Sequence, residues 1–160
     1  MYDIGLLFEV IPPHPGQNIA IIVDRAHQKS VVPKLADFCR TIEANLYVKY
    51  LEMPLVYHDA LIHEERFSFD QSVYNSKSLQ YDFFFLLADL DDVSRLKEIS
   101  KKIYRAIKNA ANLFVVLKKQ DADIAVMLLE ENNFVAINNI DLDASYDAIS
   151  AKKMHGWMKV

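Results

Sequence analysis

The sequence contains few of the residues that permit unusual backbone conformations or bind metals through sulfur. Its 160 residues include 3 glycines and 1 cysteine. A single cysteine, Cys39, excludes both an internal disulfide and a cluster of thiolate metal ligands. Because Cys39 lies in a helix-like pattern, we expect it to be a small core residue. The glycines are Gly5, Gly16 and Gly156, so nearly every turn must be built from residues that carry a Cβ atom.

The chain also lacks a long apolar run and an excess of positive charge. Its longest apolar run, Phe83–Ala88, is too short to span a bilayer. The N-terminus shows no basic segment followed by a long apolar region, so no signal peptide is expected. A net charge of -4 favours neither nucleic acid nor an anionic membrane as a partner. We therefore expect a soluble cytoplasmic protein that binds a small molecule or another protein, with a homo-oligomer as a further option.

The composition is that of a globular domain. Hydrophobic residues make up 52% of the chain, which suffices for the core of one domain of this length. The proline-rich stretch 11–16 breaks regular structure. It separates an N-terminal extension, residues 1–17, from the main domain, residues 18–160. Within the extension, residues 2–10 are predicted to form a strand or an arm of an edge hairpin.

Strand-like and helix-like segments alternate along the main domain. The predicted strands are 19–23, 46–51, 67–70, 81–87 and 113–117. The predicted helices are 31–44 with Ser30 as N-cap, 55–65, a long helix that begins at Asp91 or Asp92, and 122–131. The strand YDFFFLL at 81–87 is apolar on both faces, as is typical of a central strand in a covered parallel sheet. Its odd-numbered residues from Phe83 to Leu87 should face one side, and Phe84 and Leu86 the other.

The last part of the chain departs from this alternation. Segments 134–140 and 147–153 read as two strands, and the residues between them leave no room for a helix, so an antiparallel hairpin is expected. The whole pattern predicts an α/β fold, a three-layer Rossmann-like sandwich whose mostly parallel sheet ends in an antiparallel β-hairpin. We expect the last strand to lie between its predecessor and the parallel part of the sheet.

This order of elements resembles the class I S-adenosylmethionine-dependent methyltransferases over residues 18–153. In that family an acid ends the first strand, and Asp24 occupies this position. The resemblance implies that Glu52, at the end of the second strand, holds the ribose hydroxyls of S-adenosylmethionine, and that Asp70, after the third, contacts the adenine amine. Asp89, after the fourth strand, would join them in the cofactor site at the same edge of the sheet.

The turn after the first strand departs from the family pattern. With Asp24 in the acid position, Ala26, Gln28 and Ser30 stand where the family has glycines. Glycine permits positive φ and a close approach of backbone to ligand. The sequence therefore predicts a methyltransferase-like protein of unknown substrate whose cofactor binding is weak or lost. The alternative is a non-catalytic protein of methyltransferase fold that acts through protein association.

No catalytic group can be assigned from the sequence, and no metal is expected. The segment YDFFFLLADLDD resembles the fourth-strand region of the catechol-type O-methyltransferases, but their metal-ligand position falls on Leu87. Lys118-Lys119-Gln120 follows the next strand in place of further oxygen ligands. The acids Asp89, Asp91 and Asp92 have the spacing of helix caps, and His27 is interpreted as an exposed loop histidine.

A response-regulator receiver is a second fold that the acids allow. Such a domain would use Asp24, Asp89 and Lys118 as its acidic and basic site residues. It is disfavoured because the paired acids after the first strand are missing and the terminal hairpin would have no counterpart.

Overall fold

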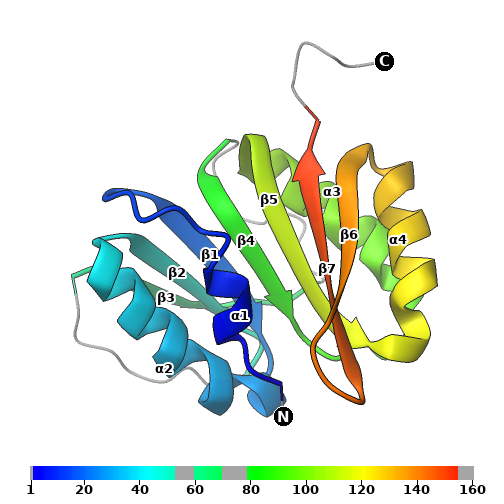
Figure 1. Ribbon diagram of the computed structural model, residues 1–160, viewed down its shortest axis with the longest axis horizontal. Coiled ribbons are helices and arrows are strands. Elements are labelled where there is room, and N and C mark those ends of the chain that lie inside the picture. The colour runs from blue at the N-terminus through cyan, green and yellow to red at the C-terminus, as the bar shows by residue number, and fades with distance from the viewer. Residues whose placement is uncertain (1, 53–59, 70–78, 155–160) are drawn as a thin grey trace.

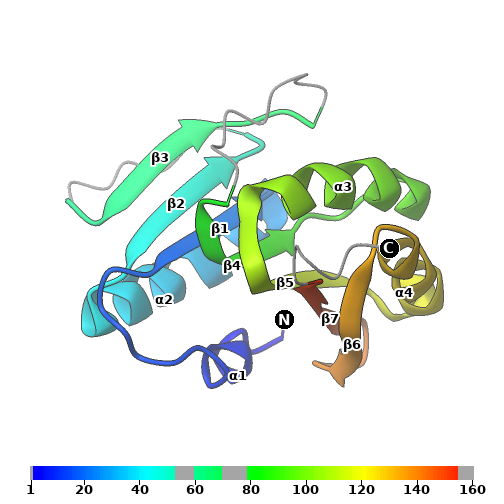
Figure 2. The same cartoon turned by 90° about the horizontal axis from the view of Figure 1, so that it is seen from above.

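The computed structural model describes residues 2–52, 60–69 and 79–154, which form a twisted sheet with helices on both faces (Figures 1 and 2). The strands are β1 Asn18–Val23, β2 Asn45–Tyr50, β3 Ile62–Arg66, β4 Tyr81–Leu87, β5 Ile107–Lys118, β6 Phe134–Asp141 and β7 Tyr146–Lys153. The α-helices are α1 Gly5–Phe8, α2 Arg25–Ile42, α3 Leu96–Ala106 and α4 Ala122–Glu131, and short 3₁₀ turns occur at Val93–Arg95 and Lys119–Asp121.

The sheet has the predicted topology. Its seven strands run in the order β3-β2-β1-β4-β5-β7-β6. All pairs from β3 to β5 are parallel, whereas β7 is antiparallel to both β5 and β6. The last strand therefore lies between its predecessor and the parallel part of the sheet, which confirms the prediction of a three-layer α/β sandwich with a terminal hairpin.

The central strand β4 is buried on both faces, as its sequence predicts. Phe83, Phe85 and Leu87 pack in the core on the face that α1 and α2 cover. Phe84 and Leu86 pack in the second core, on the face that α3 and α4 cover. Parallel strands on either side and helices above and below remove this strand from water, which explains its unbroken apolar run.

The N-terminal extension forms a short helix, so the predicted strand at residues 2–10 is wrong. Helix α1 lies on the same face of the sheet as α2 (Figure 1). Ile4, Leu7 and Ile11, in and next to this helix, are buried. Phe8 stacks on Phe38 of α2 with ring centroids 4.9 Å apart. The spacing of these apolar residues is helical, and this periodicity outweighs the β-propensity of the individual side chains.

Helix α2 begins directly after β1, so its predicted start at residue 31 is wrong. Asp24 is the N-cap: its backbone is extended, and its side chain accepts a hydrogen bond from the backbone N–H of His27. Ser30, the predicted cap, lies inside the helix, as does Pro33. The glycine-poor segment after β1 is therefore no loop, and each of its residues has helical backbone.

The third strand lies earlier in the chain than predicted. Residues 62–66 form β3, which pairs in parallel with β2, so the predicted strand at 67–70 and the C-terminal part of the predicted helix at 55–65 are wrong. In the described sheet β3 is an edge strand with exposed His63 and Glu65, and it lacks the apolar run that marks the interior strands. Residues 55–59 of the predicted helix and Asp70 lie outside the described residues.

The segment between β4 and β5 combines a capped turn with a helix. Asp92 accepts a hydrogen bond from the backbone N–H of Ser94 and caps the 3₁₀ turn that precedes α3, as expected for an acid at a helix start. Helix α3 ends at Ala106, and Ile107 already belongs to β5, which begins six residues earlier than predicted. Among the described residues no helix has both the length and the apolar character needed to cross a membrane.

Candidate functional site

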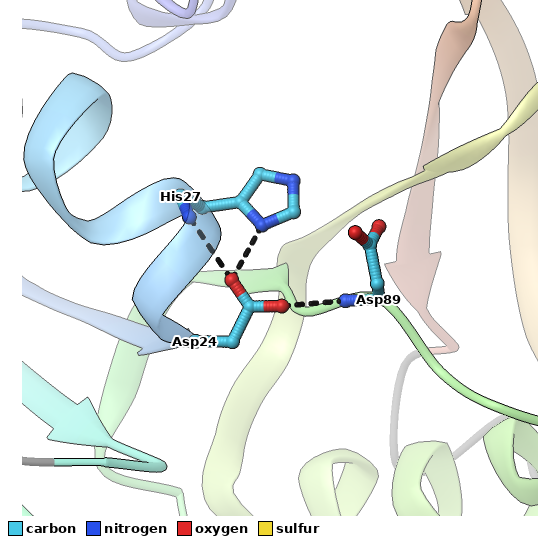
Figure 3. Close-up of side chains that lie close together, drawn as sticks. All are labelled: Asp24, His27 and Asp89. Atoms are coloured by element: carbon cyan, nitrogen blue, oxygen red, sulfur yellow. Dashed lines mark hydrogen bonds and ion pairs between the residues drawn. The ribbon is translucent and has the colours of Figure 1, made fainter.

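Side chains from the ends of β1 and β4 and from the start of α2 meet at the carboxyl edge of the parallel strands. The strand order reverses between β1 and β4, and open α/β sheets place their ligand crevice at such a point. Asp24 follows β1 here, and Asp89 follows β4. His27 projects from the first turn of α2 toward the same place (Figure 3).

Both carboxylate oxygens of Asp24 are engaged. Oδ1 accepts hydrogen bonds from the backbone N–H of His27 at 3.0 Å and from the ring Nδ1 of His27 at 2.6 Å. Oδ2 accepts from the backbone N–H of Asp89 at 2.8 Å. Burial alone would raise the pKa of Asp24, but these hydrogen bonds outweigh it and hold the pKa below 3.8. Asp24 is therefore an ionised anchor that joins β1, α2 and the end of β4.

His27 is completely buried, so its interpretation as an exposed loop histidine is wrong. Its ring lies 5.9 Å from that of Tyr2 and 5.8 Å from that of Tyr146, measured between centroids, and the two tyrosine rings lie 5.4 Å apart. The Nδ1 atom is held by Asp24, while Nε2 has no hydrogen-bond partner among the described residues. The N-terminal extension thus covers the histidine from one side and the start of β7 covers it from another.

The two tyrosines of this cluster stay protonated far above neutral pH. Burial raises the pKa of Tyr2, and the neighbouring Tyr146, Asp24 and Asp89 raise it further. Burial also raises the pKa of Tyr146, followed by the charge of Asp89, whose oxygens lie 3.4 Å from the Tyr146 hydroxyl. Both phenols are therefore neutral groups that can donate a hydrogen bond.

Glu52 lies at the same edge but is paired with the start of α2. Its Oε1 accepts from the backbone N–H of Arg25 at 3.1 Å, and its Oε2 lies 2.9 Å from the Arg25 Nε. Glu52 and Asp24 together therefore satisfy the backbone N–H groups of Arg25 and His27, and the N–H of Gln28 bonds to the Asp24 carbonyl. Carboxylates of the chain itself thus occupy the positive end of the α2 dipole.

The structure brings three of the four predicted site residues to one edge. Asp24 and Asp89 are hydrogen-bonded to one another, and Glu52 joins them through Arg25, whereas Asp70 lies outside the described residues. Sequence reasoning missed the contributions of Tyr2, Arg25, His27 and Tyr146. An Asp directly followed by six residues with good or moderate helix propensity is an N-cap signal that could have revealed the helix start and hence the place of His27.

The described surface contains two hollows that bear on the site. A small apolar one of about 20 Å³ lies beside Asp89, between the carboxyl ends of β4 and β5, and Leu90, Leu96 and Leu117 are among its walls. A larger one of about 250 Å³ lies over β2, β3 and the start of β4, where Lys49 pairs with Glu65. Asp24, Glu52 and Asp89 are not among the residues that line the larger hollow, whereas the small hollow continues the site at the carboxyl edge.

Comparisons with known proteins find similarity in structure only. No protein-family model matches the sequence, and no curated protein is significantly similar to it. An S-adenosylmethionine-dependent methyltransferase from Aquifex aeolicus superposes with a TM-score of 0.69 at 10% identity, covering 96% of this chain and 90% of the other. Phosphoethanolamine N-methyltransferase 2 from Haemonchus contortus, in complex with S-adenosyl-L-methionine, superposes with a TM-score of 0.69 at 9% identity. The match covers 94% of this chain and 52% of that enzyme, so the chain spans about half its length.

A third similar structure, the carbon methyltransferase DszA, superposes with a TM-score of 0.65 at 11% identity and with 92% of this chain covered. These matches show that the chain has a fold like that of the class I S-adenosylmethionine-dependent methyltransferases, as the order of its elements predicts. Identities this low bear on the fold and leave the chemistry of the site to its own residues.

Proposed function

We propose that the chain is a methyltransferase-like protein that binds S-adenosylmethionine weakly at the carboxyl edge of its sheet. The proposal is supported by one observation above all: Asp24 and Asp89 meet at the strand-order reversal of a methyltransferase fold, with Glu52 alongside. The Haemonchus enzyme of the same fold binds S-adenosyl-L-methionine. The substrate would be a small molecule or a partner protein, and the methyl group would come from the cofactor's sulfonium centre.

The residues present suit one part of the cofactor better than another. An edge with several carboxylates favours a cationic sulfonium and can accept hydrogen bonds from ribose hydroxyls. The cofactor's own carboxylate would need free donors, yet the N–H groups of Arg25 and His27 at the start of α2 are already bonded to Glu52 and Asp24. The helical backbone after Asp24 also adds side chains where a glycine-rich turn would leave space. Weak binding follows from these two features.

The proposal is tested by thermal unfolding in the presence of S-adenosylmethionine and, separately, S-adenosylhomocysteine. A ligand at tenfold excess over its Kd stabilises the native state by about 1.4 kcal/mol, which raises Tm by roughly 3–6 °C for a chain of this length. We expect such a rise at millimolar cofactor, and we expect Glu52→Ala to remove it while the fold persists. If the wild-type protein shows no rise, the methyltransferase proposal fails and the alternative of a protein acting by association is left.

A second variant tests the role assigned to Arg25. Arg25→Ala should strengthen cofactor binding several-fold, because it frees the Glu52 carboxylate for the ribose hydroxyls. The two side chains are 72% and 41% exposed, so losing the pair should change stability by less than about 1 kcal/mol. The pair Arg40 and Asp37 on the outer side of α2 supplies a matched control, since Arg40→Ala removes an exposed ion pair elsewhere on the same helix. Equal cofactor affinity in wild type and Arg25→Ala would show that the ion pair does not compete with the ligand.

A further inference from the structure

His27 is the only fully buried histidine among the described residues. Of its two ring nitrogens, Nδ1 is hydrogen-bonded and Nε2 has no partner among those residues. Oδ1 of Asp24 lies 2.6 Å from Nδ1, and a proton on Nδ1 would leave Nε2 with a lone pair that can bind a ligand. The hydroxyl of Tyr2, in the same ring cluster, is likewise buried and without a partner among the described residues. Burying a polar atom without a partner is unfavourable, so two such atoms in one cluster need an explanation, and a ligand that pairs with them would supply one.

The Asp89 carboxylate supplies a second group that could bind a metal ion at this place. It lies beside the His27 ring, opposite the backbone of α2 (Figure 3). Asp24, His27 and Asp89 each offer a ligand atom within 4.8 Å of the other two. The oxygens of Asp24 already accept three hydrogen bonds, whereas those of Asp89 receive, among the described residues, only the Tyr146 hydroxyl at 3.4 Å.

We propose that this cluster is a binding site for a divalent transition-metal ion of the zinc class, held by Nε2 of His27 and the carboxylate of Asp89. Asp24 acts as the outer carboxylate that receives the Nδ1–H and orients the imidazole, an arrangement typical of metal-bound histidines. One imidazole nitrogen with one carboxylate suits zinc better than magnesium, which prefers a shell made of oxygen alone. Water molecules would complete the coordination.

This site differs from the metal position considered in the sequence. That position rested on residue 87 and on Lys118-Lys119-Gln120. The proposed ligands are instead His27 in the first turn of α2 and Asp89, two residues after the end of β4. The ion would lie at the strand-order reversal, next to the small apolar hollow. Its positive charge would offset the negative charges of Asp24 and Asp89, which each offer an oxygen to the cluster.

The test measures zinc binding to the metal-free full chain, with no cofactor present. Protein treated with a chelator is dialysed against micromolar zinc, and bound metal is determined by atomic emission for wild type, His27→Gln, Asp89→Asn and His63→Gln. We expect one zinc ion per chain for wild type and for His63→Gln, whose histidine lies exposed on β3, and a loss of at least tenfold in affinity for the other two. Because Asp89 is exposed, Asp89→Asn should fold even if the buried His27→Gln does not.

The outcomes separate the metal site from adventitious binding and from the proposed function. Zinc that stays bound with unchanged affinity in Asp89→Asn, or that is lost in His63→Gln, would overturn the assignment. The absence of bound zinc in the wild type would overturn it as well. Because no cofactor takes part, failure here would leave the methyltransferase proposal intact, and failure of cofactor binding would leave the metal site intact.

Discussion

Phe84→Ala is expected to lower the free energy of unfolding by about 3–5 kcal/mol. The side chain is 1% exposed and lies in the core between the sheet and helices α3 and α4. Its ring packs edge-on against Tyr81 at 5.6 Å between centroids. With parallel strands on both sides of β4, the backbone cannot collapse into the space that the ring leaves, so the cavity persists. Urea titration monitored by circular dichroism measures the loss.

Leu6→Ala is the matched control for this change. Leu6 is 50% exposed on α1, and its truncation should alter stability by no more than about 0.5 kcal/mol. A loss below about 1 kcal/mol for Phe84→Ala would mean that β4 is not the central strand of a covered sheet.

Asp24→Ala should destabilise the protein by roughly 2–4 kcal/mol, because it removes an N-cap and leaves buried donors unpaired. The side chain is 16% exposed and serves the N–H of His27, the ring of His27 and the N–H of Asp89. Asp24→Asn keeps a capping oxygen and should recover a large part of the loss. If both variants are as stable as wild type, Asp24 does not join β1 to the end of β4.

The same residue predicts a dependence on pH with a definite sign. The pKa of Asp24 in the folded protein lies below 3.8, so its carboxylate binds protons less readily folded than unfolded. Its contribution is therefore fully present above pH 3.8 and is lost as the pH falls through the lower folded pKa. The stability difference between wild type and Asp24→Asn should be constant near neutrality and shrink in strong acid. A difference that grows on acidification would contradict the depressed pKa.

The elements with strong periodicity could be predicted from the sequence. The patterns correctly place strand β4, which is apolar on both faces, as well as helix 122–131 and the two terminal strands. Their order along the chain resembles the methyltransferase layout, and the sheet has that layout. The edge strand β3 was not predicted, because its polar residues His63, Glu64 and Glu65 lack the apolar pattern that is typical of buried interior strands.

The sequence placed some of the candidate site residues at this edge but not His27, because the start of α2 at Asp24 was not recognised. Asp24 was identified by its place after β1, but the following residues were interpreted as a turn because the methyltransferases that the sequence resembles have a glycine-rich turn there. The capping bond from His27 to Asp24 shows that the helix starts at once, and this buries His27 beneath Tyr2. A contact between residue 2 and residue 27 depends on packing of the whole N-terminal extension, which no local pattern encodes.

The claim that S-adenosylmethionine binds at the carboxyl edge is tested most directly by amide chemical shifts. The ¹⁵N-labelled chain is titrated with S-adenosylmethionine to millimolar concentration, and each backbone N–H is followed by NMR. The account predicts saturable shifts for Asp24, Arg25, Glu52 and Asp89, which share that edge, and unchanged resonances for Val135 on the distant strand β6. Shifts confined to other parts of the sheet, or no shifts at all, would contradict it.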